Sequence, residues 1–567
     1  MIRSADGVLR TLVVTIALVG PVAVRPVGQT SRAFKLEEAT IAQINAALDT
    51  GALSCQRLTQ LYLNRITAYD NGGPRLNSII TVNPKALDVA AALDAERRLR
   101  GPRSRLHCVP VLLKDNIDTA DMPTSNASVI LKDSIPADDA YIARVLREAG
   151  AVILGKASMG EFAGSSYNTL DGQVVNPYHF KRNTGGSSAG SGASIAANLA
   201  VVAVGTDTST SVRAPSAFNG LAGLRPTTGL ISRDGIAPKN LLFDTAGPMA
   251  RTVTDMAILL SAIAGPDPND PLGFNKRVYE NHPLYKGGGP ETRFSNVNGA
   301  PRGIDYTQFL RKGSLKGARI GVARDYWGGD PEIVALGEAA IAKMKALGAT
   351  IVEGIKVETT QYTSNIREIA DYRFREDWEA YLATLGPTVP KTVAKFLKIY
   401  DTVVARSPLP LEPNIHRLLA NSLTKTSADP AYQNLVNKTL PDNTKSKLAI
   451  FDGQRLDALV FPYSATFAAP ISNPAYKVDD PTWKTFPRPA NPSSFAPYSS
   501  VGFPMIVVPM GFGTQGLPMS IALMAKPYEE GKLVGYAYDY EQATMHRRPS
   551  PLVPPLPGES ILVSSTK

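Results

Sequence analysis

The sequence predicts an α/β protein with a substantially parallel sheet, and two observations indicate this class. Short apolar runs such as Val109–Leu113 and Ala151–Leu154 have the length and residue types of buried strands. These runs alternate along the chain with amphipathic helical stretches, which is the pattern of βαβ units. Hydrophobic residues make up 44% of the 567 residues and charged residues 19%, so the chain has enough apolar material for a large core.

The predicted elements extend from residue 35 to residue 546. In the first stretch, Leu36, Ile41, Ile44 and Leu48 recur at helical spacing. Helices are predicted at 35–70 (as two helices), 85–100, 139–149, 192–200, 332–347 and 530–546. Strands are predicted at 109–113, 151–154, 200–204, 318–322, 458–461, 505–508 and 519–523.

Three segments depart from this alternation. Residues 266–313 are rich in Gly, Pro, Asn and charged residues, which predicts a long surface insertion. Residues 360–450 are predicted to be mostly helical and to form a cap or side layer. The tail at 549–567 is rich in Pro and Ser and is predicted to be disordered. We therefore expect a single domain over residues 31–548.

The charge and the residue types exclude several kinds of site. The net charge of +10 is a mild excess for this length, and no Lys/Arg cluster carries interleaved aromatic residues, so no nucleic-acid partner is expected. The five histidines have no metal-binding spacing, so we expect no metal and no cofactor. Cys55 and Cys108 are the only cysteines, and they are able to pair in an oxidising compartment.

The first 30 residues have the pattern of a signal peptide. Arg3 and Arg10 precede an uncharged run from Thr11 to Val24, and Arg25 ends it. This run is short for a membrane span but suits a signal-peptide core, so a secreted or periplasmic protein is expected, with no stable membrane span after processing. The alternative is a disordered or membrane-anchored leader.

Three polar segments follow predicted strands or open predicted helices. The first ends the run Val109–Leu113 with Lys114, and the second is the Gly- and Ser-rich run Gly185–Gly192. A loop of that kind at a helix N-terminus offers free N–H groups, but it lacks the Gly-Lys-Ser/Thr ending of a nucleotide-binding P-loop. The third segment, Gly205–Phe218, contains four consecutive hydroxyl residues that also suit an ordinary turn.

Two better-known catalytic patterns fit parts of the chain. Gly186–Gly190 matches G-x-S-x-G, which would make Ser188 a nucleophile with His546 as a late histidine. That elbow must follow a buried strand, and the preceding residues 176–184 are polar and contain Pro, so we reject it. Ser422 and Lys425 match S-x-x-K, but no K-T-G partner follows, and we set this match aside.

Together the three segments resemble the amidase signature family, and the resemblance covers residues 38 to 548. It includes two late stretches, Val501–Gly511 and Gly516–Ser520. In the family the first Ser of the Gly-Gly-Ser-Ser run precedes the nucleophile by 24 positions, as Ser187 here precedes Ser211. The resemblance implies a large mixed, mostly parallel sheet covered by helices on both faces. It also implies a catalytic triad of Lys114, Ser187 and Ser211 with a cis peptide bond at Ser187.

The chemistry of this triad explains its residue types. A Ser hydroxyl needs a base, and a Lys can serve as one if burial lowers its pKa from about 10.4. Ser187 would then pass the proton between Lys114 and Ser211 and deliver it to the leaving amine. Gly185 and Gly186 would ease an unusual backbone conformation beside Ser187.

By resemblance, the residues around the nucleophile support the reaction. The backbone N–H groups of Thr208, Ser209 and Thr210 are expected to form the oxyanion hole. Further residues are expected to support the loops or bind near the substrate: Asp207, Arg213, Gly185, Gly186 and Ser188. Family members commonly have Gly at the positions of Ser209 and Thr210, so either the loop angles here suit Ser and Thr or the oxyanion hole is altered.

The resemblance predicts hydrolysis of linear amides to a carboxylic acid and ammonia or an amine. The runs ending at Ser232 and beginning at Tyr538 resemble those of bacterial peptide amidases and related broad-specificity amidases. Side activity on esters, anilides or carbamates is also expected, because the same acyl-enzyme chemistry applies. The alternatives are the glutaminase subunit of a tRNA-dependent amidotransferase and an inactive binding protein. A monomer or homodimer is expected.

Overall fold

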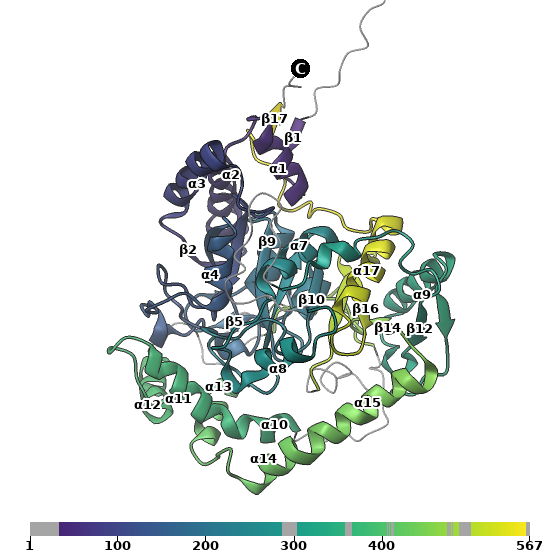
Figure 1. The fold of residues 1–567 in the computed structure, drawn as a ribbon. Coiled ribbons are helices and arrows are strands. Elements are labelled where there is room, and N and C mark those ends of the chain that lie inside the picture. The colour runs from purple at the N-terminus through teal and green to yellow at the C-terminus, as the bar shows by residue number, and fades with distance from the viewer. Residues whose placement is uncertain are drawn as a thin grey trace, which may run out of the picture.

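The computed structural model is organised around an 11-stranded sheet that supports the predicted site (Figure 1). It describes residues 33–285, 303–357, 366–404, 413–472, 480–486 and 501–562, together with Arg406, Leu409 and Val478. In sheet order the strands are β13 (Thr350–Val352), β12 (Arg319–Val322), β14 (Ala458–Pro462), β16 (Pro518–Met524), β15 (Met505–Phe512), β10 (Ala222–Arg225), β11 (Thr245–Ala250), β9 (Val202–Asp207), β3 (Pro110–Lys114), β4 (Val152–Ala157) and β2 (Ile79–Val82).

The large mixed sheet is confirmed, but it is less parallel than we expected. Parallel pairing is confined to β13–β12–β14 and to β9–β3–β4. Every other neighbouring pair of the sheet is antiparallel. The prediction rested on apolar runs and missed β10 and β11, since the sequence of β11, TAGPMA, lacks β-branched apolar residues. These two strands, with β15 and β16, form the antiparallel middle of the sheet.

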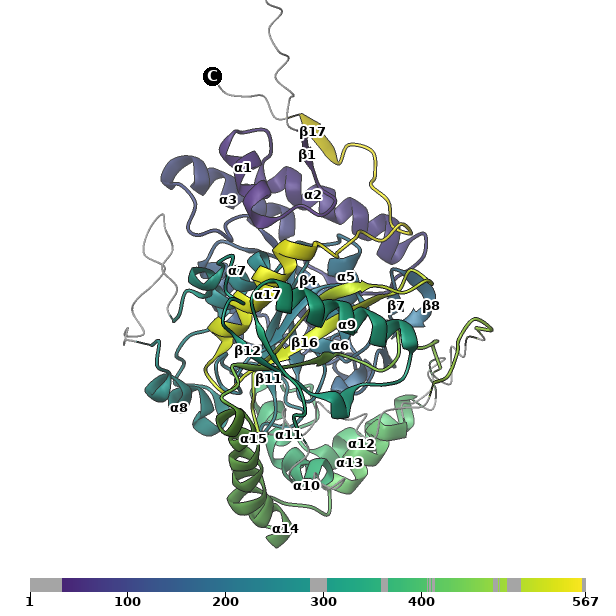
Figure 2. The ribbon, with the colours of Figure 1, turned by 90° about the vertical axis from the view of Figure 1, so that its right-hand side faces the viewer.

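Helices flank the sheet in two groups, as the alternation of elements predicts. α7 packs on α4 and on α17, and all three pack on the sheet, while α5, α6 and α9 pack on strands from β4 to β13. Figure 2 shows α7 and α17 together with α5, α6 and α9. These and the N-terminal helices are α1 (Ile41–Asp49), α2 (Cys55–Arg65), α3 (Ala86–Arg100), α4 (Tyr141–Glu148), α5 (Ala189–Ala196), α6 (Arg213–Phe218), α7 (Val253–Ile263), α9 (Pro331–Ala346) and α17 (Glu530–Thr544). α1 begins at a capping box formed by Thr40 and Gln43.

Residues 366–454 form a mainly helical side layer beyond one end of the sheet (Figure 1). Its helices are α10 (Ile366–Ala370), α11 (Phe374–Thr384), α12 (Val393–Val404), α13 (Pro413–Ser422), α14 (Pro430–Asn434) and α15 (Leu440–Gln454). The layer shares an apolar cluster with the main body, in which the ring centroids of Trp378 of α11 and Phe162 of the main body are 5.1 Å apart. This contact joins the side layer to the loop beside the site.

The segment 266–313 is more embedded than a surface insertion. Asp270 is buried and pairs with the buried Arg233 at 2.8 Å. The short helix α8 (Phe274–Asn281) follows, and Tyr306 lies fully buried in the core. Charge and Gly content concealed these buried contacts, because a paired charge is tolerated in the interior. The middle of the segment, 286–302, lies outside the described residues.

The C-terminal tail is ordered to residue 562, which corrects the prediction of disorder. β17 (Ser560–Leu562) pairs antiparallel with β1 (Ala33–Lys35). Just before it, Glu559 forms a buried ion pair with Arg65 of α2 at 2.9 Å. A tail rich in Pro and Ser carries few apolar residues, so its order depends on these long-range partners and has no local sequence signal.

Two short hairpins complete the described structure. They are formed by β5 (Tyr167–Asn168) with β6 (Gly172–Gln173) and by β7 (Val175–Asn176) with β8 (His179–Asn183). Within the described ranges, no helix combines the length and the apolar character needed to cross a bilayer. The predicted signal peptide at residues 1–30 lies outside the described ranges, so it stays a prediction.

Candidate active site

Lys114 is placed by β3 at the centre of the candidate site. All five residues of β3 are buried, and Lys114 ends the strand with no exposed surface. Its Nζ donates to Ser187 Oγ at 2.8 Å and to Thr206 Oγ1 at 2.8 Å, with the Thr206 carbonyl at 3.3 Å. Burial lowers the pKa of the Lys114 ammonium from the usual 10.5 to about 7, although Asp207 and Asp244 act to raise it.

The Gly-Gly-Ser-Ser loop presents Ser187 to this lysine. The Gly186–Ser187 peptide bond is cis, and Gly160 donates its N–H to the Ser187 carbonyl at 3.1 Å. A Cβ at Gly186 would lie 2.3 Å from the Ser165 carbonyl oxygen, so no side chain fits there. Gly185 has a φ of +71°, which glycine adopts without strain. The two glycines therefore allow the close packing that holds Ser187 beside Lys114.

Ser188 is bound to the sheet and does not form a nucleophile elbow. Its hydroxyl donates to the Thr206 carbonyl at 3.0 Å and accepts from the Thr206 N–H at 3.2 Å. The strand before it, β8, pairs with β7 and, through a bridge at Arg182, with Pro470, outside the main sheet. The rejection of Ser188 as an α/β-hydrolase nucleophile is consistent with this geometry, since that nucleophile follows a central strand.

Ser211 lies in the turn between β9 and α6 and is 7% exposed. Its carbonyl accepts the Ser188 N–H at 3.2 Å, so the turn is joined directly to the loop that carries Ser187. The three predicted triad residues thus come from β3 and from two loops that the sheet brings together. The neighbouring β9 and β3, in parallel register, make this meeting possible.

A buried charge cluster shapes the turn before Ser211. Asp207 accepts from Arg213 Nε at 3.1 Å, from Arg225 Nη1 at 3.1 Å and from the Val212 N–H at 3.0 Å. Burial by itself would raise the pKa of the Asp207 carboxyl, but the guanidinium groups of Arg213 and Arg225 hold it well below its usual range. Arg213 also donates to the Ser209 carbonyl. Asp207 and Arg213 therefore fix the backbone of this turn.

The turn itself accepts Ser and Thr without strain. None of residues 208–211 is among the left-handed residues of the chain, so the angles at Ser209 and Thr210 do not require glycine. The Thr208 hydroxyl donates to Asp244 Oδ1 at 2.6 Å, and the Thr210 side chain hydrogen-bonds Tyr463. Of the two explanations for the absent glycines, the geometry favours loop angles that suit Ser and Thr.

Sequence reasoning missed several residues that hold the site. Thr206 bonds both Lys114 and Ser188, and its position directly before Asp207 in the third segment was a usable signal. Asp244 and Tyr463 reach the site from more than 30 residues along the chain, and Arg225 ends β10, 18 residues after Asp207. No local motif marks these three residues.

A cavity of about 600 Å³ lies between the main body and the helical layer, and none of its lining residues belongs to the triad. It is lined by the loop residues Ala163 and Gly164, by Lys239, and by residues of α10 and α13. Ser422 and Lys425, which match S-x-x-K, also line it, but the Ser422 hydroxyl donates to the Leu419 carbonyl at 2.8 Å. Lys425 Nζ instead lies over the Tyr372 ring, 4.5 Å from its centroid, so the two residues do not form a catalytic pair.

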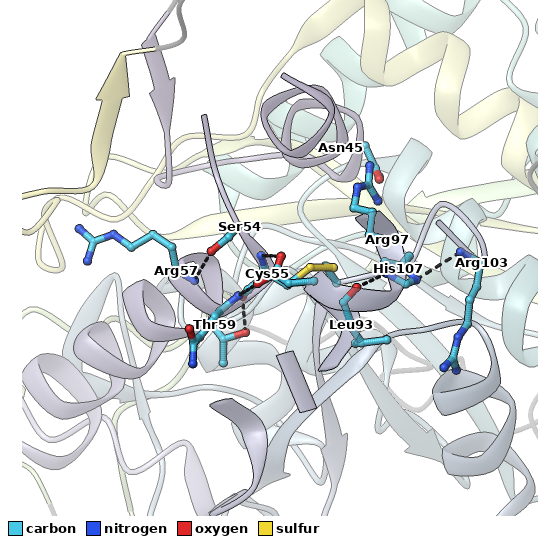
Figure 3. The surroundings of a disulfide bond; sticks show 12 residues. Asn45, Ser54, Cys55, Arg57, Thr59, Leu93, Arg97, Arg103 and His107 are labelled. Atoms are coloured by element: carbon cyan, nitrogen blue, oxygen red, sulfur yellow. Dashed lines mark hydrogen bonds between the residues drawn. A yellow bond between two sulfur atoms is a disulfide. The ribbon is translucent and has the colours of Figure 1, made fainter. Parts of the chain in front are cut away.

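The two cysteines form a disulfide that joins α2 to the residues before β3 (Figure 3). Both are fully buried, and their Cα atoms are 5.1 Å apart. With His107 they form the only group of three metal-type ligands within the described ranges. His107 Nε2 lies 3.1 Å from the Leu93 carbonyl, and its Nδ1 accepts the Arg103 N–H at 3.2 Å. The paired sulfurs and the occupied ring nitrogens do not fit a metal ion.

The fold and the site define an enzyme that hydrolyses amides. Comparison with known proteins identifies the family within this class of enzymes. The family model described as Amidase matches residues 57–534. The chain belongs to the amidase family, and specifically to the proteins that share the amidase signature.

The relatives of the chain include enzymes of more than one kind. A probable amidase of Arabidopsis thaliana is 32% identical over 535 residues, with 92% of each chain covered. A glutamyl-tRNA(Gln) amidotransferase subunit from Microcystis aeruginosa is 32% identical over 532 residues, covering 90% of this chain and 98% of the relative. Among solved structures, the native peptide amidase of Stenotrophomonas maltophilia is 34% identical with a TM-score of 0.76, covering 90% of this chain and 98% of that chain.

Proposed function

We propose that the protein hydrolyses carboxamides by a Ser-cisSer-Lys mechanism in which Ser211 is the nucleophile, Ser187 the proton relay and Lys114 the base. The observation that carries the proposal is the 2.8 Å hydrogen bond between Lys114 Nζ and Ser187 Oγ, in a site where burial lowers the pKa of Lys114 to about 7. A lysine with that pKa is substantially neutral at neutral pH and able to accept a proton.

Acylation begins when Ser211 Oγ attacks the carbonyl carbon of the amide. The Ser211 proton passes to Ser187 while the Ser187 proton passes to Lys114. The oxygen of the tetrahedral intermediate takes the negative charge and is stabilised by the backbone N–H groups of Thr208, Ser209 and Thr210. The carbon–nitrogen bond then breaks, and the leaving nitrogen takes a proton from Ser187, which is reprotonated by Lys114. Ammonia or an amine leaves, and Ser211 keeps the acyl group as an ester.

Deacylation repeats these transfers with water. Water attacks the ester carbon, its proton passes through Ser187 to Lys114, and the acid is released as Ser211 recovers its proton. Because an ester, anilide or carbamate presents the same acyl carbon, slower turnover of these substrates is expected as a side activity.

The substrate class proposed is a peptide or small-molecule amide. The likeness to peptide amidase supports this, since that structure resembles the present chain along nearly its whole length. The alternative is a glutaminase that works together with partner proteins, and the 32% identity to the amidotransferase supports it. An inactive binding protein is disfavoured, because Lys114 bonds Ser187 and the Ser211 carbonyl bonds the next residue, Ser188.

A substrate panel tests the mechanism. Purified protein is incubated with peptide amides, anilides, esters and glutamine, and release of ammonia or amine is measured. We expect turnover of peptide amides by wild type, none above background by Ser211→Ala, and labelling of wild type but not Ser211→Ala by a fluorophosphonate probe. Turnover of glutamine but of no other substrate in the panel, seen only when partner proteins are added, would favour the glutaminase alternative. Full activity in Ser211→Ala would contradict the mechanism.

We also propose that the protein is exported and works as a monomer or homodimer. The signal-peptide pattern at residues 1–30 supports export, and the buried Cys55–Cys108 disulfide is the kind of bond that persists in oxidising compartments. Cell fractionation followed by mass analysis of alkylated protein tests this. Intact, reduced protein found only in the cytoplasm would contradict it, and light scattering reports the oligomeric state.

A further inference from the structure

The cavity beside the side layer is connected to the candidate site through both of its walls. On one wall, Ala163 and Gly164 lead into Ser165, whose carbonyl oxygen packs against Gly186. On the other, the Lys239 N–H donates to Asp244 Oδ2 at 2.8 Å, and Asp244 also holds Thr208 beside the nucleophile. The two walls of this cavity are therefore each one contact removed from the residues that position Ser187 and Ser211.

The size of the cavity suits part of a substrate. Its volume of about 600 Å³ lies within the range of roughly 300–1,000 Å³ typical of sites for small molecules. The helices α10 and α13 supply most of its outer wall, and these belong to the side layer and not to the sheet. The side layer is thus placed to determine which acyl groups are accepted.

The charges on the wall are unequal. Three basic residues, Lys239, Arg417 and Lys425, face two acidic residues, Glu368 and Asp371. Asp371 Oδ1 accepts from Asn240 Nδ2 at 3.1 Å, which orients the carboxylate but keeps its charge, so these five side chains together carry one net positive charge.

The side layer supplies two of the three basic residues, Arg417 and Lys425. Within the part of the chain that the structure describes, neither Arg417 nor Lys425 forms an ion pair. Lys425 Nζ lies 4.5 Å from the centroid of the Tyr372 ring, a contact that orients the ammonium but leaves its charge in place. The wall therefore presents a positive potential to whatever enters the cavity.

We propose that this cavity is an acyl-side subsite and that Arg417 and Lys425 favour acyl groups that carry a carboxylate. The preferred substrates are peptide amides with Glu or Asp one or two residues before the residue whose amide is cleaved. The inference rests on the proposed amide hydrolysis and adds the substrate preference to it. Charge complementarity of this kind discriminates between substrates of equal size, because an uncharged isostere loses the attraction while keeping the packing.

The test uses tripeptide amides that differ only in carrying Glu, Gln or Lys at the first or second residue. For wild type we expect kcat/KM for the Glu peptide to exceed that for its Gln counterpart by about fivefold, the upper range for a partly exposed ion pair. The Lys peptide should be the poorest substrate. The preference should shrink as salt is raised, because exposed charges are screened.

Variants of the two basic residues localise the preference. Lys425→Ala and Arg417→Ala should each reduce the ratio of Glu to Gln, and Lys425→Glu should move the preference toward the Lys peptide. Lys395→Ala is the matched control: it removes an exposed lysine of α12 that does not line the cavity, and it should keep the wild-type ratio.

The outcomes separate this inference from the function on which it rests. Equal rates on Glu and Gln peptides in wild type, or an unchanged ratio in the Arg417→Ala, Lys425→Ala double variant, would overturn the subsite. Wild-type protein that turns over none of the peptides, nor any small amide, would instead contradict the proposed function.

Discussion

Two buried lysines lie on neighbouring strands of the sheet with their side chains on opposite faces, and one of them has a carboxylate oxygen 3.9 Å from its ammonium. Lys114 ends β3, and Lys156 lies on the neighbouring β4, where it pairs in register with Leu113. Both are fully buried. Lys156 Nζ donates to Thr124 Oγ1 at 2.8 Å and to the Pro123 carbonyl at 3.2 Å, with Asp115 Oδ1 at 3.9 Å. The nearest partners of Lys114 are hydroxyls and one carbonyl.

One sheet therefore holds both a structural lysine, Lys156, and a candidate base, Lys114. Burial lowers the pKa of both ammonium groups, because it penalises the charged form. At Lys156 the nearby Asp115 offsets part of that effect and favours the ion pair. The carboxylates that act on Lys114 are otherwise occupied: Asp207 pairs with two arginines, and Asp244 binds Thr208. Lys114 is therefore the lysine that gives up its proton more readily.

Of the substitutions considered, replacing Lys114 should have the largest effect. It should lower activity without lowering stability. In Lys114→Met the base is lost, so kcat/KM for a peptide amide should fall by about 10³–10⁴-fold. The folded state should be at least as stable as wild type, because the variant removes a buried ammonium that has no carboxylate in contact. Steady-state kinetics and thermal unfolding check both parts. A variant that keeps more than a tenth of wild-type activity would exclude Lys114 as the base.

Replacing Lys156 should instead affect stability. Lys156→Met leaves Asp115 buried without its cation, and the free energy of unfolding should fall by about 3–5 kcal/mol. Denaturant unfolding measures the change. Adding Asp115→Asn to this variant should recover part of the loss, because it removes the stranded carboxylate. If the single variant were as stable as wild type, the Lys156–Asp115 pair would not be a stabilising feature.

The Cys55–Cys108 disulfide anchors the residues that lead into β3, not those that lead into β4. It closes a loop of 53 residues, so replacing both cysteines with Ser should lower the free energy of unfolding by about 2–4 kcal/mol. Denaturant unfolding with and without a reductant measures this. Reductant should destabilise wild type by a similar amount and leave the double variant unchanged. Equal stability of oxidised and reduced wild type would argue against a stabilising bond.

The pH profile gives the smallest effect and distinguishes the two lysines most directly. If Lys114 is the base, its neutral form is active, so kcat/KM should rise with pH and level off above an apparent pKa of about 7. Between pH 7 and pH 8 the rise should be about twofold. The Asp115→Asn variant should keep this midpoint, because Asp115 acts on Lys156. A rising limb centred above pH 9 would mean that burial does not lower the pKa of Lys114 as described.

The catalytic candidates could be predicted because they lie in short motifs. Lys114, Ser187 and Ser211 come from three segments whose resemblance to the amidase signature family identified them, and adjacent strands bring those segments together. Asp244 and Tyr463 could not be found in this way, since each acts across more than 30 residues of sequence. The antiparallel centre of the sheet was missed for a related reason: β11 is built from small residues and a proline, and only its neighbours make it a strand.

The pairing of β1 with β17 makes the described chain almost a closed ring. Ala33 lies opposite Leu562 in an antiparallel register, at the end of the molecule away from the side layer (Figures 1 and 2). A short linker could join the two strands, and new ends could then be opened in an exposed loop elsewhere. Such a circular permutant would keep every contact of Lys114, Ser187 and Ser211, and the β1–β17 edge would no longer be the place where the described residues begin and end.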